Sequence, residues 1–73
     1  MLREIITLND NNIGETIRAL RMARGMSVKD LASVVTISPS MINRYENGRR
    51  TPSLRVFTAI MRALDAEIFF AKR

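Results

Sequence analysis

The stretch from Ser27 to Gly48, SVKDLASVVTISPSMINRYENG, predicts two short helices joined by a tight turn. Ser27 marks the start of the first helix, because Asp30 follows it at a spacing close to that of a capping box. Ser38 precedes Pro39, which fits the first position of a helix because its missing N–H would have no partner there. Gly48 marks the end of the second helix, as glycine often does.

Two short helices separated by only about three residues are typical of a helix-turn-helix, whose second helix can enter a DNA major groove. The turn falls at Thr36 and Ile37. The residues expected to face inward recur at helical spacing. They are Leu31, Ala32, Val35, Ile37, Ile42 and Tyr45.

A further helix is expected on each side of this stretch. In the preceding one, Asp10 is a suitable N-cap and Gly25 marks the end, while Gly14 lowers the intrinsic stability of the helix. Its apolar stripe consists of Ile13, Ile17 and Leu20. In the following one, Ser53 is the expected cap and the helix runs to about Leu64. Its amphipathic stripe consists of Leu54, Phe57, Ile60, Met61 and Leu64.

The two ends of the chain have strand-like sequences. Residues 1–9 are rich in Leu and Ile and predict a strand or an ordered arm. The segment EIFFAKR at 67–73 predicts a short strand rather than a fifth helix. The predicted organisation is an arm or strand at 1–9, a helix-turn-helix domain at 10–65 and a tail at 66–73.

The composition limits the chemistry of the chain. It has 73 residues, with no Cys and no His. A core of this size is marginal, and the missing residue types exclude disulfides and the usual zinc ligands. There is no nucleophile–base pair and no phosphate-binding glycine loop, so we expect neither an enzyme nor a bound cofactor or metal. Helix packing and oligomerisation remain as sources of stability.

The net charge of +5, from 12 Lys and Arg against 7 Asp and Glu, favours a polyanionic partner, although a merely soluble basic surface would carry it too. Arginine predominates, and its fork of donors suits phosphate and the edge of guanine. No apolar run approaches the ~18–20 residues that span a bilayer, and no signal peptide is evident. We therefore expect a cytoplasmic protein without a membrane partner.

The pattern LAxxxxIS…I..YENG…P is more specific than a general helix-turn-helix propensity. Its residues are Leu31, Ala32, Ile37, Ser38, Ile42, Tyr45, Glu46, Asn47, Gly48 and Pro52. It closely resembles the XRE family of regulators, the phage-repressor and Cro-like class, over about Ile13 to Leu64. The resemblance implies an all-α, lambda-repressor-like bundle of four to five short helices. It also implies DNA binding, usually as a dimer, by a protein that is phage-encoded or associated with the bacterial nucleoid.

The resemblance assigns the recognition helix to residues 39–47. Its outward residues, the candidate base contacts, are Pro39, Ser40, Asn43 and Arg44. Asn43 can pair with adenine and Arg44 with guanine, each through two hydrogen bonds. Phosphate contacts position the helix without reading sequence. The candidates for them are Lys29, Asn47, Arg49, Arg50 and Thr51. The alternative is that all these side chains are ordinary solvated residues.

The resemblance also implies a buried structural pair between Arg21 and Glu46. Three positions depart from the family pattern. Val28 replaces a usual Gln, Thr36 stands where the turn usually has Gly, and Pro39 replaces a base-reading side chain. A left-handed backbone at Thr36 would be strained, because threonine is β-branched.

The tail is similar to that of HipB-type antitoxins, in which a short strand pairs with its mate across a dimer. Ile68, Phe69 and Phe70 are therefore candidate dimer contacts, unless the aromatic rings fold back onto the helices. The leading expectation is a sequence-specific repressor that binds a pseudo-palindromic DNA operator as a homodimer. The alternatives are an antitoxin that binds both its operator and a toxin, and an interaction module that does not read bases.

Overall fold

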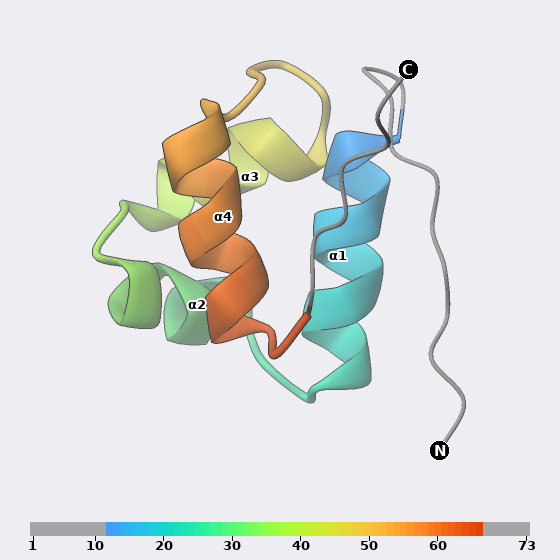
Figure 1. The fold of residues 1–73 in the computed structure, drawn as a ribbon, viewed down its shortest axis with the longest axis vertical. Coiled ribbons are helices and arrows are strands. Elements are labelled where there is room, and N and C mark those ends of the chain that lie inside the picture. The colour runs from blue at the N-terminus through green and yellow to red at the C-terminus, as the bar shows by residue number, and fades with distance from the viewer. Residues whose placement is uncertain (1–11, 67–73) are drawn as a thin grey trace, which may run out of the picture.

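The computed structural model describes residues 12–66, which form four α-helices (Figure 1). They are α1 (Ile13–Ala23), α2 (Val28–Val35), α3 (Pro39–Glu46) and α4 (Leu54–Ala63). Residues 12–66 contain no strand, so the expected all-α helix-turn-helix bundle is confirmed for this part of the chain. The strands expected at the two ends, and the dimer contacts Ile68, Phe69 and Phe70, lie outside the described residues.

Serine side chains start α2, α3 and α4, as the sequence predicts. The hydroxyl groups of Ser27, Ser38 and Ser53 each accept a hydrogen bond from the backbone N–H of the residue three positions later, at 3.0–3.2 Å. Helix α2 has a complete capping box, because the Asp30 carboxylate also accepts the backbone N–H of Ser27 at 2.9 Å. The prediction for α1 was wrong. A capping residue must directly precede the first helical residue, and that place belongs to Asn12 rather than Asp10.

Each of the four described helices is followed by a residue with a left-handed backbone. These residues are Gly25 (φ 66°), Thr36 (φ 55°), Gly48 (φ 73°) and Asp65 (φ 54°). In each case the next residue donates its N–H to a carbonyl in the last turn, the arrangement of a Schellman motif. At the end of α4 the Nε of Arg24 also donates to the carbonyl oxygen of Leu64 at 2.6 Å, which ties the end of α1 to the end of α4.

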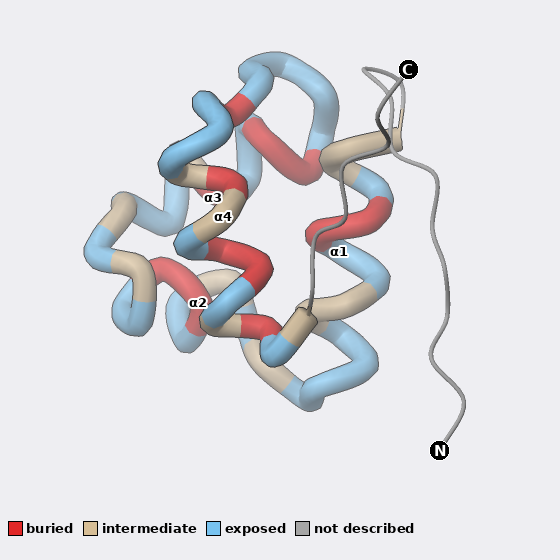
Figure 2. Tube along the Cα trace, viewed as in Figure 1, coloured by how far each residue is buried: buried red, intermediate tan, exposed pale blue. Residues whose placement is uncertain are grey.

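The core is built by apolar residues from all four helices, and Figure 2 shows how their buried faces turn toward one another. Its buried members are Ile17, Leu31, Ala32, Ile42, Tyr45, Phe57, Ile60, Met61 and Leu64. Helix α3 packs against α1 and α2, and α4 packs against α2. Val35 and Ile37 lie half-buried at the edge of this core, so the inward faces predicted for α2, the turn and α3 are confirmed. The stripe predicted for α4 was wrong at Leu54, which lies at the start of that helix and is 61% exposed, whereas Phe57, Ile60, Met61 and Leu64 are buried. The opposite face of α3 is left open to solvent.

Candidate nucleic-acid interface

The outward face of α3 carries the polar side chains that sequence analysis selected. Ser40, Asn43 and Arg44 are exposed, and their spacing of three and four residues places them along one side of the helix. Ile42 and Tyr45 are buried on the other side. Within residues 12–66 the three exposed side chains make no hydrogen bond or ion pair with the rest of the chain. Their donors and acceptors are therefore available to an external partner.

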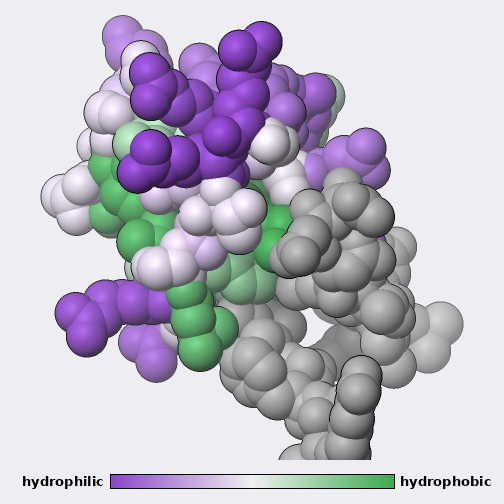
Figure 3. Space-filling model, turned by 90° about the horizontal axis from the view of Figure 1, so that it is seen from above, coloured by the Kyte–Doolittle hydropathy of each residue, from purple (hydrophilic) through white to green (hydrophobic). Residues whose placement is uncertain are grey.

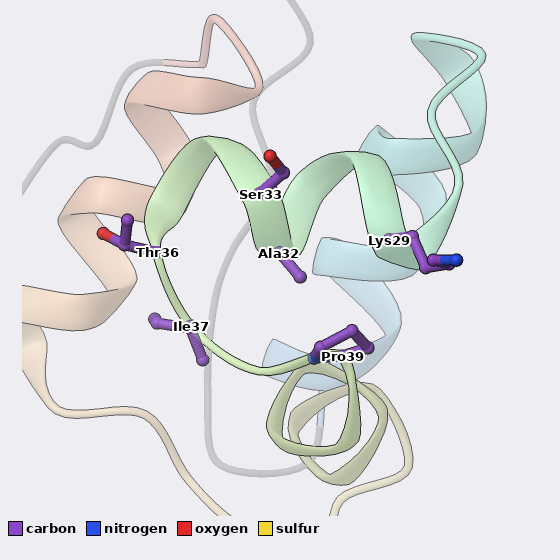
Figure 4. Close-up of a pocket in the computed structure, with 6 residues that line it drawn as sticks. All are labelled: Lys29, Ala32, Ser33, Thr36, Ile37 and Pro39. Carbon is purple, nitrogen blue, oxygen red and sulfur yellow. The ribbon is translucent and has the colours of Figure 1, made fainter.

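A shallow hollow of about 300 Å³ lies between α2 and the start of α3 (Figure 4). It is lined by Lys29, Ala32, Ser33, Thr36, Ile37 and Pro39. Lys29 stands on the first turn of α2, and the turn after Thr36 returns the chain to Pro39 on the opposite side of the hollow. A candidate phosphate contact and a candidate base contact thus border the same depression.

The remaining phosphate candidates lie at and after the end of α3. Asn47 is the C-cap of α3, and Arg49, Arg50 and Thr51 lie in the loop that leads to α4; all four are exposed. Figure 3 looks down on this end of the molecule and shows hydrophilic residues gathered over one side of it. The site is a surface of positive charge and hydrogen-bond donors next to the outward face of α3.

Arg55 is a basic residue near this surface that sequence analysis did not select. It is exposed in the first turn of α4, directly after the loop that holds Arg49 and Arg50. A positive charge near a helix N-terminus opposes the helix dipole, so helix stability does not explain it. Two features of the sequence could have indicated Arg55: it stands in the first turn of a predicted helix, where a positive charge is unfavourable, and it closely follows Arg49 and Arg50.

An ion pair between Arg21 and Glu46 fixes the far side of α3 to α1. The Nε of Arg21 donates to Oε2 of Glu46 at 2.7 Å, and its Nη2 donates to Oε1 at 3.0 Å. The side chains are 12% and 2% exposed, respectively. The third donor, Nη1, reaches the carbonyl oxygen of Met26 at 2.8 Å. The hydrogen bonds to Glu46 raise the pKa of Arg21, so its guanidinium stays charged in the pair.

A second arginine of α1 joins this pair from the solvent side. The Nε of Arg18 lies 3.3 Å from Oε1 of Glu46, and its Nη2 donates to Oδ1 of Asn47 at 2.7 Å. The Arg18 side chain is 48% exposed. Two arginines therefore share one buried carboxylate, so the contact between α1 and α3 formed by Arg18, Arg21 and Glu46 carries one excess positive charge.

The structure also accounts for two of the departures from the family pattern. Thr36 has φ 55° and ψ 42°, so the turn keeps a left-handed residue although glycine is absent. The fold thus tolerates the strain of a β-branched residue there. Val28 is half-buried and packs against the core, so it supplies apolar packing rather than a polar group at the start of α2.

Residues 12–66 hold no cluster of three or more acidic side chains that could bind a metal ion. None of the helices in this range has the length and apolar character needed to cross a membrane.

The helix-turn-helix family HTH_3 matches residues 17–69. The match covers well over half of the chain, which therefore belongs to this family of XRE-type helix-turn-helix domains. The multiprotein-bridging factor 1 of Candida glabrata is 41% identical over 59 residues, which are 81% of this chain and 39% of that protein. An uncharacterized HTH-type transcriptional regulator of Archaeoglobus fulgidus is 42% identical over 65 residues, 85% of this chain and 28% of that protein. The chain thus spans at most about two fifths of the length of these relatives.

Solved structures share the fold. The clp gene regulator ClgR from Corynebacterium glutamicum superposes with a TM-score of 0.76 at 27% identity, over 82% of this chain and 64% of that one. HipB in its O2 20mer complex has a TM-score of 0.80 at 17% identity, over 96% of this chain and 97% of that one. The second likeness concerns the fold alone.

Proposed function

We propose that this chain is a DNA-binding transcription regulator that inserts α3 into the major groove. The observation that carries the proposal is the division of α3 into two faces. Its buried face is fixed to the core and to Arg21, whereas the side chains of Ser40, Asn43 and Arg44 are exposed and make no hydrogen bond within the described residues. A rigid helix with unengaged polar side chains on its outer face suits base reading.

The proposed contacts divide into two groups. Asn43 pairs with adenine and Arg44 with guanine, Ser40 donates to a base or phosphate, and Pro39 offers apolar contact. The phosphate contacts are made by Lys29, Asn47, Arg49, Arg50 and Thr51, all of them exposed.

The proposal extends to a homodimer that binds two half-sites about 34 Å apart and represses transcription. If each protomer neutralises about four phosphates, the logarithm of the association constant should fall with the logarithm of the salt concentration at a slope of about −7. The dimer contacts would be Ile68, Phe69 and Phe70. Replacing Phe69 and Phe70 with Asp in the full chain should then yield a monomer in light scattering. An unchanged dimer that Leu54→Asp dissociates would place the interface on α4, where Leu54 is 61% exposed.

The experiment that tests the function is binding to the DNA upstream of the chain's own gene, with excess competitor DNA at physiological salt. A regulator should prefer the upstream fragment by a large factor, because specific sites are typically bound about 10³-fold or more tightly than other DNA. Equal affinity for all sequences would contradict base reading.

A second candidate function is supported by the relatives named multiprotein-bridging factor 1. In this alternative the same bundle links other proteins and reads no bases. Weak, sequence-independent DNA binding together with capture of a transcription protein would favour it. A third alternative, an antitoxin, rests on likeness of fold to HipB, which one solved structure contains in a HipA-HipB-O2-O3 complex. A toxin gene next to this one, and a complex of the two products, would support it.

A further inference from the structure

Arg18 links the buried ion pair to the surface that would meet DNA. Its guanidinium holds Glu46 through Nε, at 3.3 Å, and Asn47 through Nη2, at 2.7 Å. Glu46 is itself held by two hydrogen bonds from Arg21. A continuous series of hydrogen bonds therefore runs from the buried side of α1 to the exposed C-cap of α3.

The bond to Arg18 determines which way the Asn47 amide faces. A guanidinium has only donors, so the group of Asn47 that it contacts must be the carbonyl oxygen Oδ1. The Nδ2 group, with its two N–H donors, is then turned away from Arg18. Asn47 is exposed, and within residues 12–66 its Nδ2 donates to no other group. An outward pair of N–H donors next to Arg49 and Arg50 suits a phosphate oxygen.

We propose that Arg18 is a positioning residue, which holds the Asn47 amide so that its N–H groups face a backbone phosphate of bound DNA. The proposal rests on the DNA-binding function proposed above. Arg18 acts through the geometry of its planar fork, which reaches an oxygen of Glu46 and an oxygen of Asn47 at once. A lysine has one ammonium group and cannot reproduce this arrangement.

The structure favours this role over a purely structural one. Glu46 already receives two hydrogen bonds from Arg21 and is 2% exposed, so it is paired without Arg18. The Arg18 side chain is about half exposed, and exposed ion pairs add little stability. Removing Arg18 should therefore leave the fold intact and free the Asn47 amide to rotate.

The test uses the full chain and a short labelled DNA duplex of random sequence, because phosphate contacts do not depend on sequence. Arg18→Ala, Arg18→Lys, Asn47→Ala and the double variant Arg18→Ala/Asn47→Ala are compared by fluorescence anisotropy at several salt concentrations. Arg62→Ala is the control, since Arg62 is an exposed residue of α4 whose side chain makes no hydrogen bond or ion pair within the described residues. Thermal unfolding checks that every variant is folded.

We expect each single alanine variant to bind about tenfold more weakly, and the double variant to bind no more weakly than either. Arg18→Lys should bind as weakly as Arg18→Ala. The salt slope should stay unchanged in Arg18→Ala, because the phosphate contact belongs to a neutral amide. Without DNA, the side-chain amide of Asn47 should gain mobility in Arg18→Ala, measured as a lower NMR order parameter.

Three binding results would overturn the proposal. They are a double variant about a hundredfold weaker, full binding by Arg18→Lys, and a salt slope reduced by about one, which marks a direct phosphate contact by Arg18. An unchanged order parameter for Asn47 would overturn it as well. If the unaltered chain binds no DNA, the proposed function fails too. If it binds DNA but the losses of affinity in Arg18→Ala and Asn47→Ala add up in the double variant, only the role proposed for Arg18 fails.

Discussion

Gly14 in α1 lies directly against the backbone carbonyl of Tyr45 in α3. A Cβ atom on Gly14 would stand 2.3 Å from the carbonyl oxygen of Tyr45 and 2.8 Å from that of Glu46. No side chain separates the two helices here, so their backbones set the distance between them. This contact explains why a glycine is present in the first turn of α1 although it lowers helix propensity.

Gly14→Ala should destabilise the protein by about 1–3 kcal/mol, because the new methyl group would push α1 away from α3. The gain in helix propensity, about 1 kcal/mol, offsets only part of this loss. Urea denaturation measures the difference. Ala19→Gly, at an exposed position of α1, reports the propensity effect alone. A Gly14→Ala variant as stable as the parent would show that the helices can separate without loss.

Arg21→Ala should lower the free energy of unfolding by about 3–5 kcal/mol, because it leaves the carboxylate of Glu46 buried without its main partner. The lower end of this range is expected, since Arg18 remains 3.3 Å from Oε1 of Glu46. Chemical denaturation gives the value. The control is Arg62→Ala, which removes an exposed arginine and should change stability by less than about 0.5 kcal/mol. If the free energy of unfolding of Arg21→Ala lies within about a few tenths of a kcal/mol of the parent value, the pair has no structural role.

Thr36→Gly should stabilise the protein by about 1 kcal/mol, because threonine is strained in the left-handed backbone that it adopts there. Asp65→Gly offers a matched comparison, since Asp65 has nearly the same φ but aspartate tolerates this conformation better. The shift in denaturation midpoint should therefore be larger at position 36. A loss of stability in Thr36→Gly would mean that the side chain makes a contact worth more than the strain.

The capping box of α2 should give stability that depends on pH. The backbone N–H of Ser27, and then its hydroxyl, lower the pKa of the Asp30 carboxyl below its ordinary 3.8. A group whose pKa is lower in the folded state stabilises the fold above its ordinary pKa and loses that effect as pH falls through the folded value. Asp30→Asn should thus lower the melting temperature at pH 7, and the difference should shrink at pH values below 3.8. Ser27→Ala should destabilise by about 1 kcal/mol at pH 7 and lose only part of this effect below pH 3.8, because the bond from the Asp30 backbone N–H to the hydroxyl does not titrate.

Arg44→Ala and Arg50→Ala should affect DNA binding in different ways. Loss of a bidentate contact to guanine should cost about 1–3 kcal/mol and relax specificity at one base pair. Loss of a phosphate contact at Arg50 should weaken all sequences alike and reduce the salt slope by about one. Binding of a library of half-site variants at two salt concentrations separates the two. Identical sequence profiles for both variants would contradict base reading by Arg44.

Local signals made the helix-turn-helix predictable. The caps at Ser27, Ser38 and Ser53 act within one turn of their own helices, so the sequence was sufficient to place α2, α3 and α4. The start of α1 was missed because its N-cap, Asn12, makes no side-chain capping bond. The contact between Gly14 and α3 could not be foreseen, because it depends on how two separate helices approach each other.

The three arginines of α1 show the same limit at the candidate site. Arg18, Arg21 and Arg24 are equally spaced in the sequence, yet they reach Asn47, Glu46 and the carbonyl oxygen of Leu64, respectively. These partners lie 25 to 40 residues away along the chain. The partner of Arg21 was predicted from the family resemblance alone. The partners of Arg18 and Arg24 could not be predicted, because they depend on where α3 and the end of α4 lie relative to α1.

The side chains on the outer face of α3 are uncoupled from the stability of the fold. These side chains belong to Ser40, Asn43 and Arg44 and make no hydrogen bond within the described residues, so replacing them should leave the melting temperature nearly unchanged. Mutations at these positions therefore face few constraints from folding. A protein built in this way can acquire a new target through single substitutions, and descendants with different targets can diverge from one scaffold without passing through unstable intermediates.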